Sequence, residues 1–244
     1  MTNIYESERL LNEYLLFHYG SAAEVLPWDF GPVEALGFAE RSVSVLLDRA
    51  LLPQPATALD LGCAVGRSCY ELAQTCDRVI GIDFSQRFVD AAEQIRTSGE
   101  MPYEQHVEGR ETRSLVAKRP EPGDATRISF EQGDAMNLRE DLGSFNVVHA
   151  ANLLCRLPEP HRLIERLPKL VKPGGQLLLT TPCTWLEEFT PSQSWPKGST
   201  FDWLKEGLSG SFELAEQMDL PFLIREHARK FQWSVAMGSR WVRL

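Results

Sequence analysis

The sequence predicts a doubly wound α/β fold, in which helices cover both faces of a mostly parallel sheet. Three observations lead to this fold class. From Thr57 onward, short apolar runs alternate with helical patterns. A glycine-containing turn directly follows the first run, and the segments between runs are long enough for right-handed crossovers. The length of 244 residues fits one such domain with added elements.

Five strand patterns and three helical patterns make up this alternation. The expected strands are TALDL, RVIGIDF, RISFEQGD, FNVVHAAN and QLLLTTP. The expected helices cover residues 66–76, 86–96 and 158–171; Ser85 is a good N-cap for the second, and a proline begins the third. A shorter helix near 201–208 and two final β patterns, FELAEQM and WSVAMGSRWVRL, complete an expected core of residues 53–244.

Residues 1–52 precede the first strand and are expected to form a helical cover. Apolar residues recur at helical spacing from Ser7 to Tyr19, and a second helix is expected from Phe38 to Leu51. Residues 101–124 interrupt the alternation as a polar insertion, which forms either a hairpin or a mobile loop. We therefore expect a single domain, 1–244, and the first helix with its aromatic loop is a candidate lid over bound ligands.

Composition limits the classes of partner. The net charge of −9 disfavours a nucleic-acid substrate and favours a small molecule. The sequence holds no apolar run long enough to span a membrane, and its acidic start lacks the features of a signal peptide, so a cytoplasmic location is expected. Five cysteines without CxxC spacing predict reduced thiols, with neither a disulfide framework nor a metal site.

The strongest local signal is the turn DLGCAVGR, residues 60–67, at the end of the first strand. Its glycines permit positive φ and close approach of a ligand, and the following helix offers free N–H groups. In doubly wound sheets, ligands bind beyond the carboxyl ends of the strands at this switch point. Asp83 ends the second strand about twenty residues later, where an acid accepts hydrogen bonds from ribose hydroxyls.

Both a dinucleotide and S-adenosylmethionine fit this geometry, and two residues favour the second. Ala64 replaces the glycine that would clear a pyrophosphate, and Asp60 is an acid better suited to the cationic aminopropyl end of S-adenosylmethionine. Asp134 is placed to accept from the adenine amino group, and Arg67 to steady the cofactor carboxylate. The expected cofactor-binding residues are Asp60, Gly62, Cys63, Ala64, Gly66, Arg67, Asp83, Phe84, Gly133, Asp134, Ala135 and Asn152.

These elements, in this order, resemble the Rossmann-like class I methyltransferases. The segment LVKPGGQLLLTTP is similar to their turn and fifth strand, and the two closing strands are similar to their terminal pair. The resemblance implies a seven-stranded, mostly parallel sheet with a terminal antiparallel strand. It also implies S-adenosylhomocysteine as a product.

Segments outside the cofactor motifs resemble a narrower family, the methyltransferases that complete ovothiol biosynthesis. The most distinctive are EYLLFHYG, TWLEEFTP and LPFLIREHARKFQWSV. The resemblance implies methylation of the imidazole π-nitrogen of 5-thiohistidine to give ovothiol A. In many members this domain follows an iron-dependent sulfoxide synthase; since the present chain begins with the methyltransferase part, a separate synthase is expected to supply the substrate.

A zwitterionic amino acid needs an acceptor for its ammonium group and donors for its carboxylate. Asn152 and Tyr19 are expected to position the substrate without acting as acid or base, since a neutral imidazole is already a nucleophile. Arg225 and His227 are expected between the last two strands, in a charged run that also fits a solvated face. The expected substrate-binding residues are Tyr14, His18, Tyr19, Asn152, Thr184, Trp185, Glu187, Arg225 and His227.

Three other functions remain open from the sequence. The chain fits a class I methyltransferase for another small molecule equally well in its cofactor residues. A non-catalytic methyltransferase-like subunit is disfavoured by the intact acids and glycines of the turn, and a nicotinamide-dependent oxidoreductase is disfavoured by Ala64.

Overall fold

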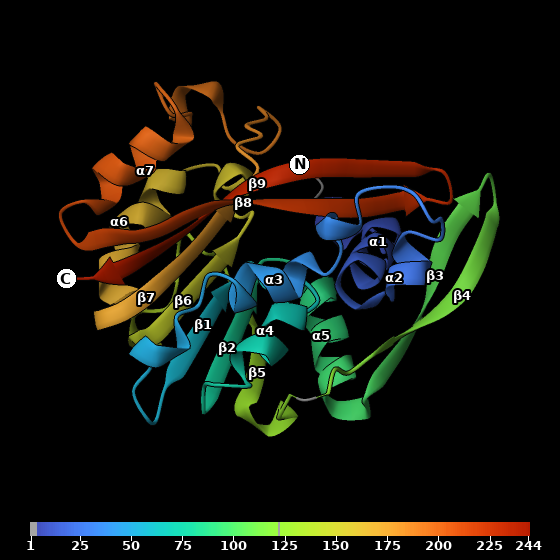
Figure 1. Cartoon of the computed structure of the whole chain (residues 1–244), viewed down its shortest axis with the longest axis horizontal. Coiled ribbons are helices and arrows are strands. Elements are labelled where there is room, and N and C mark those ends of the chain that lie inside the picture. The colour runs from blue at the N-terminus through green and yellow to red at the C-terminus, as the bar shows by residue number, and fades with distance from the viewer. Residues whose placement is uncertain (1–3, 122) are drawn as a thin grey trace.

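Seven strands form one sheet in the order β5-β2-β1-β6-β7-β9-β8, in a computed structural model that describes residues 4–121 and 123–244. β1, β2, β5, β6 and β7 are parallel, whereas β9 is antiparallel to both of its neighbours. The predicted fold class is therefore confirmed (Figure 1). The strands are β1 (Thr57–Leu61), β2 (Arg78–Asp83), β5 (Ile128–Gln132), β6 (Phe145–Ala151), β7 (Val171–Thr181), β8 (Phe212–His227) and β9 (Lys230–Arg243).

Helices cover both faces of this sheet. The α-helices are α1 (Glu8–Tyr19), α2 (Ala22–Val25), α3 (Phe38–Ser44), α4 (Arg67–Leu72), α5 (Gln86–Ser98), α6 (Pro160–Leu170) and α7 (Thr200–Leu208). Alternate residues of each central strand enter different clusters. Leu59 and Leu177 belong to the cluster that includes α6 and α7, whereas Ala58 and Leu178 belong to the cluster that includes α3 and α4. This period of two is expected of a sheet buried on both faces.

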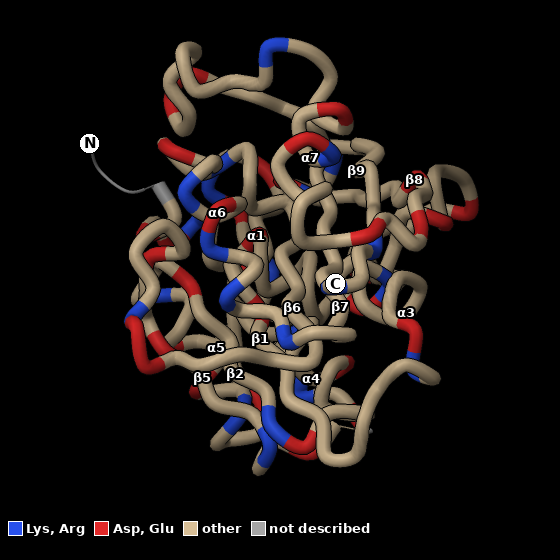
Figure 2. Tube along the Cα trace, turned by 90° about the vertical axis from the view of Figure 1, so that its left-hand side faces the viewer, with Lys and Arg blue, Asp and Glu red and all other residues tan. Residues whose placement is uncertain are grey.

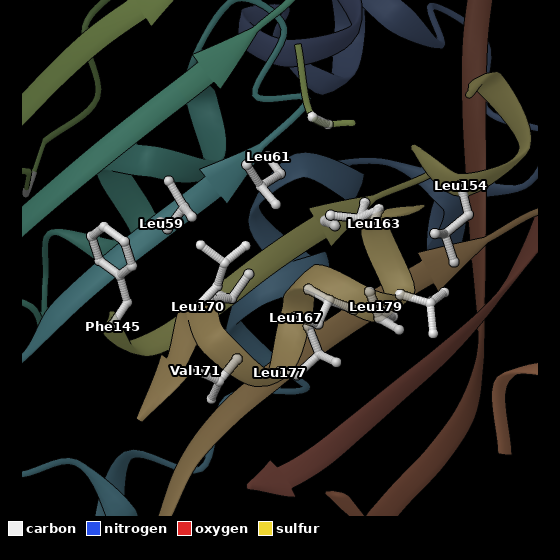
Figure 3. Close-up of a cluster of buried hydrophobic side chains, with 14 of the residues drawn as sticks. Leu59, Leu61, Phe145, Leu154, Leu163, Leu167, Leu170, Val171, Leu177 and Leu179 are labelled. Carbon is white, nitrogen blue, oxygen red and sulfur yellow. The ribbon is translucent and has the colours of Figure 1, made fainter. Parts of the chain in front are cut away.

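The cluster beneath α6 shows how the helix is held. Leu163, Leu167 and Leu170 of α6 point towards the side chains of β1, β6 and β7 (Figure 3). The three leucines are completely buried. Their spacing of three to four residues places them on one helical face, as the sequence pattern indicates.

The N-terminal cover differs from the prediction in one respect. α1 begins after the N-cap Ser7, whose side chain accepts a hydrogen bond from the Leu10 amide, and it ends at Tyr19 as expected. The second helix, however, ends at Ser44 and resumes only as a 3-10 turn, Arg49–Leu51. The Asp48 side chain accepts from the Ala50 amide and so caps the start of this 3-10 turn.

The insertion is a hairpin of β3 (Glu100–Glu108) and β4 (Glu111–Lys118), as one of the two alternatives predicted. Tyr103, Leu115 and Ala117 are buried in a cluster shared with α1 and α5. The hairpin leans past α1 towards the far end of β8 and β9 (Figure 1), where the Ala228 amide donates to the Val107 carbonyl at 3.2 Å. The hairpin therefore packs as part of the N-terminal cover.

The last two strands are longer than their sequence patterns. β8 continues to His227 and β9 begins at Lys230, so Arg225 and His227 lie in a strand and not between strands. The expected position of both residues was wrong because the charged run pairs with β9, across an irregularity between Arg225 and His227, while the apolar Phe222 and Leu223 are buried.

The composition bears on two features of the fold, the surface charges and the hydropathy of the helices. Basic and acidic positions are interspersed on the side of the chain drawn in Figure 2. Among the described residues, no helix is both long enough and apolar enough to cross a membrane.

Candidate active site

Backbone strain marks the carboxyl edge of the sheet. Within residues 4–121 and 123–244, three non-glycine residues have positive φ: Ala64 at 48°, Asn152 at 54° and Cys183 at 54°. They follow β1, β6 and β7, which are neighbours in the sheet. Strained residues that gather at one place are a sign of a functional site, and this is the edge at which doubly wound folds bind ligands.

The glycine turn is shaped by contacts that a side chain would block. Gly62 has φ of 69°, and Gly66, with φ of 85°, precedes α4. A Cβ on Gly66 would lie 2.5 Å from the Phe130 ring, so only glycine fits there. The Gly62 amide donates to the Ile82 carbonyl at 2.8 Å, which ties the turn to β2.

Asp60 is buried inside the protein, with 1% of its surface exposed. One carboxylate oxygen lies 2.7 Å from Nδ1 of His149; the other accepts from the Ser68 hydroxyl at 2.5 Å and the Cys69 thiol at 3.2 Å. Although burial acts to raise the pKa of Asp60, these partners hold it below its ordinary value. Since both oxygens are used internally, direct contact with the cationic end of the cofactor gains no support, and Asp60 instead braces the turn.

Asp83 has the environment of a ribose acceptor. Its two oxygens accept from the Ala64 and Ser85 amides, each at 2.9 Å, which fixes the carboxyl group beside the glycine turn. Burial raises its pKa to about 6. Each oxygen keeps a lone pair for a ribose hydroxyl, and Phe84 is 58% exposed next to it, where a ring could cover an adenine.

Asp134, predicted to accept from the adenine amino group, lies just after the neighbouring strand β5. One Asp134 oxygen accepts from the Met136 amide at 2.8 Å, and the other has no hydrogen bond to the described residues. The Gly133 amide donates to the Asp83 carbonyl at 2.9 Å, so the Gly133–Ala135 turn lies directly beside the ribose acid.

Two buried nitrogens near the glycine turn lack partners among the described residues. They are Nδ1 of His18 and Nη1 of Arg67. Burial lowers the pKa of His18 to about 3, so its ring is neutral at pH 7. The second terminal nitrogen of Arg67, Nη2, contacts the Glu40 carboxylate. A neutral acceptor and a cationic donor beside one turn fit the ammonium and carboxylate groups of the methionine part of S-adenosylmethionine.

Tyr19 of α1 and Cys63 of the glycine turn both make contacts that stabilise the turn or keep the side chain buried. The Tyr19 hydroxyl donates to the Val65 carbonyl at 2.7 Å, so Tyr19 holds the glycine turn. Cys63 is buried, and burial raises the pKa of its thiol to about 11, which argues against a nucleophile.

Asn152 is held at the end of β6 by β7. Its side-chain oxygen accepts from the Thr180 hydroxyl at 2.9 Å, and its amide donates to the Thr180 carbonyl at 2.9 Å. Among the described residues the side-chain NH₂ has no partner. This arrangement supports Asn152 as a positioning residue.

Several expected substrate residues lie elsewhere or face solvent. Arg225 donates to the carbonyls of Glu24 and Ala228 and lies over two aromatic rings, so it stabilises the far end of β8. His227 contacts His106 of the insertion. Trp185 donates to Thr200 and packs on Trp203, whereas Thr184 and Glu187 are exposed.

Three further residues near this edge were not predicted from the sequence: Tyr5, Arg156 and Phe189. Tyr14 lies within an aromatic group with Tyr5 and Phe88, and Tyr5 also packs on Phe189. Arg156 lies over the Phe189 ring at 4.7 Å. The sequence offers one weak indication for Arg156, its position four residues after Asn152 in the segment AANLLCRLPEP.

A separate apolar pocket, about 420 Å³ in volume, lies away from this edge and is lined by Leu26, Trp28, Phe30, Gly31, Pro32, Leu223, Phe231 and Trp233. None of these residues belongs to the glycine turn or to a carboxyl strand end. The strained residues and unpartnered nitrogens identify the carboxyl edge as the candidate active site.

The fold is that of the class I methyltransferases, and comparison with known proteins agrees. Residues 36–232 match the family described as "Methyltransferase domain", and the chain belongs to that family.

Two curated relatives illustrate the range of the family. A ubiquinone biosynthesis O-methyltransferase of Coxiella burnetii is 27% identical over 123 residues, which cover 50% of this chain and 42% of that protein. The 27-O-demethylrifamycin SV methyltransferase of Amycolatopsis mediterranei is 28% identical over 145 residues, covering 57% and 45%. The chain thus matches less than half the length of these relatives.

Solved structures share the fold at low identity. A putative S-adenosylmethionine-dependent methyltransferase from Listeria monocytogenes has a TM-score of 0.55 at 15% identity, covering 84% of this chain and 98% of that one. The N-methyltransferase NodS from Bradyrhizobium japonicum, solved with S-adenosylhomocysteine, has a TM-score of 0.50 at 17% identity, covering 77% and 78%.

Proposed function

We propose that the enzyme methylates the imidazole π-nitrogen of 5-thiohistidine and so produces ovothiol A. One observation carries the proposal: two distinctive segments that resemble the ovothiol methyltransferases adjoin the carboxyl edge. EYLLFHYG supplies Tyr14, His18 and Tyr19 of α1. TWLEEFTP supplies Phe189, which packs on Tyr5 and Arg156.

The side chains at this edge suit a reaction that needs orientation more than acid–base catalysis. Bound S-adenosylmethionine supplies a methyl group on a sulfonium. The ring nitrogen forms a bond to this carbon as the sulfur–carbon bond breaks, and the substrate thiolate balances the positive charge that the ring acquires. The protein must hold the nitrogen in line at about 3 to 3.5 Å. The NH₂ group of Asn152 and the neutral ring of His18 are available to orient the ligands.

The cellular location of the enzyme and the source of its substrate are also part of the proposal. We infer that it works in the cytoplasm and that a sulfoxide synthase makes the 5-thiohistidine on which it acts. Both inferences rest on the resemblance to the ovothiol methyltransferases.

The test is a mass-spectrometric assay of the purified protein with S-adenosylmethionine and 5-thiohistidine, with histidine and ergothioneine as competing substrates. Methyl transfer to 5-thiohistidine alone is expected. Asn152→Ala should lower kcat/KM at least about tenfold, because orientation is lost, whereas Asn137→Ala, at an exposed position, should not. Absence of transfer while S-adenosylhomocysteine still binds would refute the substrate and leave the enzyme class standing.

A further inference from the structure

Arg156 is fixed between two strand ends of the active site. It ends a 3-10 turn, Leu154–Arg156, that follows β6. Its Nη1 donates to the Cys155 carbonyl and to the Thr184 carbonyl, both at 3.1 Å, so it joins the segments after β6 and β7. Its guanidinium carbon lies 4.7 Å from the Phe189 ring centroid. A guanidinium held from two sides has lost most of its freedom before any ligand binds.

The charge of Arg156 is not neutralised within the protein. No carboxylate of the described residues forms an ion pair with it, whereas Arg67 pairs with Glu40 and Arg162 pairs with Glu159. Arg156 is half-buried, so water screens its charge only in part. A partly desolvated guanidinium without an acid is a suitable site for an anionic group of a ligand.

The group that Arg156 now contacts is neutral. Burial raises the pKa of Tyr5, although the charge of Arg156 and a hydrogen bond from it act in the opposite direction, so the phenol keeps its proton at pH 7. Tyr5 belongs to a short N-terminal turn, Ile4–Glu6, whose position is fixed in part by a hydrogen bond of 3.1 Å from the Ser85 hydroxyl to the Tyr5 carbonyl. A neutral oxygen is a weaker partner for a guanidinium than a carboxylate.

Arg156 also lies on the cofactor side of the edge. It follows the strained Asn152 by four residues, and the Thr184 carbonyl that it contacts directly follows the strained Cys183. Because the cofactor is expected at this carboxyl edge, Arg156 is within reach of a small substrate that faces the cofactor.

We propose that Arg156 binds the α-carboxylate of an amino-acid substrate, with the carboxylate replacing the Tyr5 hydroxyl as its partner. This inference rests on the proposed function in so far as the substrate is an amino acid. Arg156 was not among the expected substrate-binding residues, whereas Arg225 and His227, which were, lie near the end of β8. The enzyme then discriminates against amines that carry the same ring without the carboxylate.

The experiment compares 5-thiohistidine with 5-thiohistamine, which lacks only the carboxylate. Binding of each to the full chain saturated with S-adenosylhomocysteine is measured by calorimetry for wild type, Arg156→Gln, Arg156→Lys and the control Arg162→Gln. Wild type should bind 5-thiohistidine at least about tenfold more tightly, as one charge-assisted contact permits. Arg156→Gln should lose this preference, Arg156→Lys should keep part of it, and Arg162→Gln should behave as wild type.

The remaining outcomes separate this inference from the proposed function. Equal weakening of both ligands, or weaker S-adenosylhomocysteine binding in Arg156→Gln, would show a structural or cofactor role and overturn the inference. Methylation of 5-thiohistidine with an unchanged preference in Arg156→Gln would also overturn it while the function stands. If wild type neither binds nor methylates 5-thiohistidine, the proposed function is refuted. The same titration is then made with other amino acids and the amines that lack only their carboxylate. If none of these pairs shows a preference for the carboxylate that depends on Arg156, the inference is refuted as well.

Discussion

At the scale of the residue, His18 links acid stability to the active site. Its ring nitrogen is buried without a partner, and burial lowers its folded-state pKa from 6.5 to about 3. Between these pH values the unfolded chain binds a proton that the folded chain does not. Stability therefore rises with pH across this window, by up to about 1.4 kcal/mol per pH unit from this group. His18→Gln should flatten the dependence in urea unfolding between pH 4 and 6.5; an unaltered slope would contradict the assignment.

Asp83 is expected to make cofactor affinity depend on pH. Its pKa is raised to about 6 by burial, so it is a carboxylate at pH 7 and mostly a neutral acid at pH 5. The neutral acid is a weaker acceptor for ribose hydroxyls, and S-adenosylhomocysteine should bind up to about tenfold more weakly at pH 5 than at pH 7. Asp83→Asn should bind weakly at both values. Calorimetric titrations at the two pH values test this, and equal wild-type affinities would rule it out.

At the scale of the element, the β3–β4 hairpin is a packed wall and not a loose flap. Tyr103 is 5% exposed within the cluster that contains α1 and α5. Tyr103→Ala should cost about 3 kcal/mol, as expected when a buried aromatic ring leaves a cavity. Val116, on the same hairpin but 43% exposed, provides the control, because Val116→Ala should cost less than about 0.5 kcal/mol. Urea unfolding measures both free energies. If both variants lose less than about 0.5 kcal/mol, the hairpin is not packed against the core and the prediction is wrong.

Local patterns explain which elements could be predicted from the sequence. The glycine turn and Asp83 follow from short motifs whose geometry is set by neighbouring residues, and the strand patterns follow from their periodicity. The position of Arg225 could not be predicted, since it depends on how far β8 and β9 pair. The same holds for Asp60: its carboxylate is taken up by His149, a residue 89 positions later in the chain. Arg156 was overlooked because its neighbours, Tyr5 and Phe189, are distant in sequence.

At the scale of the whole molecule, one cluster joins the cover, the insertion and the cofactor turn. Leu15 of α1, Leu115 of the hairpin and Val65 of the turn are all buried in it. His149 adds a polar link, because its ring contacts Asp60 of β1 and Ser42 of α3 at 2.7 and 3.1 Å. Loosening of the cover therefore disturbs the cofactor turn, and parts that share a core unfold together.

Thermal unfolding should accordingly show one cooperative transition that responds to the cofactor product. S-adenosylhomocysteine at one hundred times its Kd adds about 2.7 kcal/mol to the stability of the folded state. For a chain of this size, that should raise Tm by roughly 5 to 10 °C. Calorimetry with and without the ligand measures the shift, with a nicotinamide dinucleotide as the control that should produce none. A separate transition for the N-terminal cover, unaffected by S-adenosylhomocysteine, would show that the cover folds independently and does not sense the site.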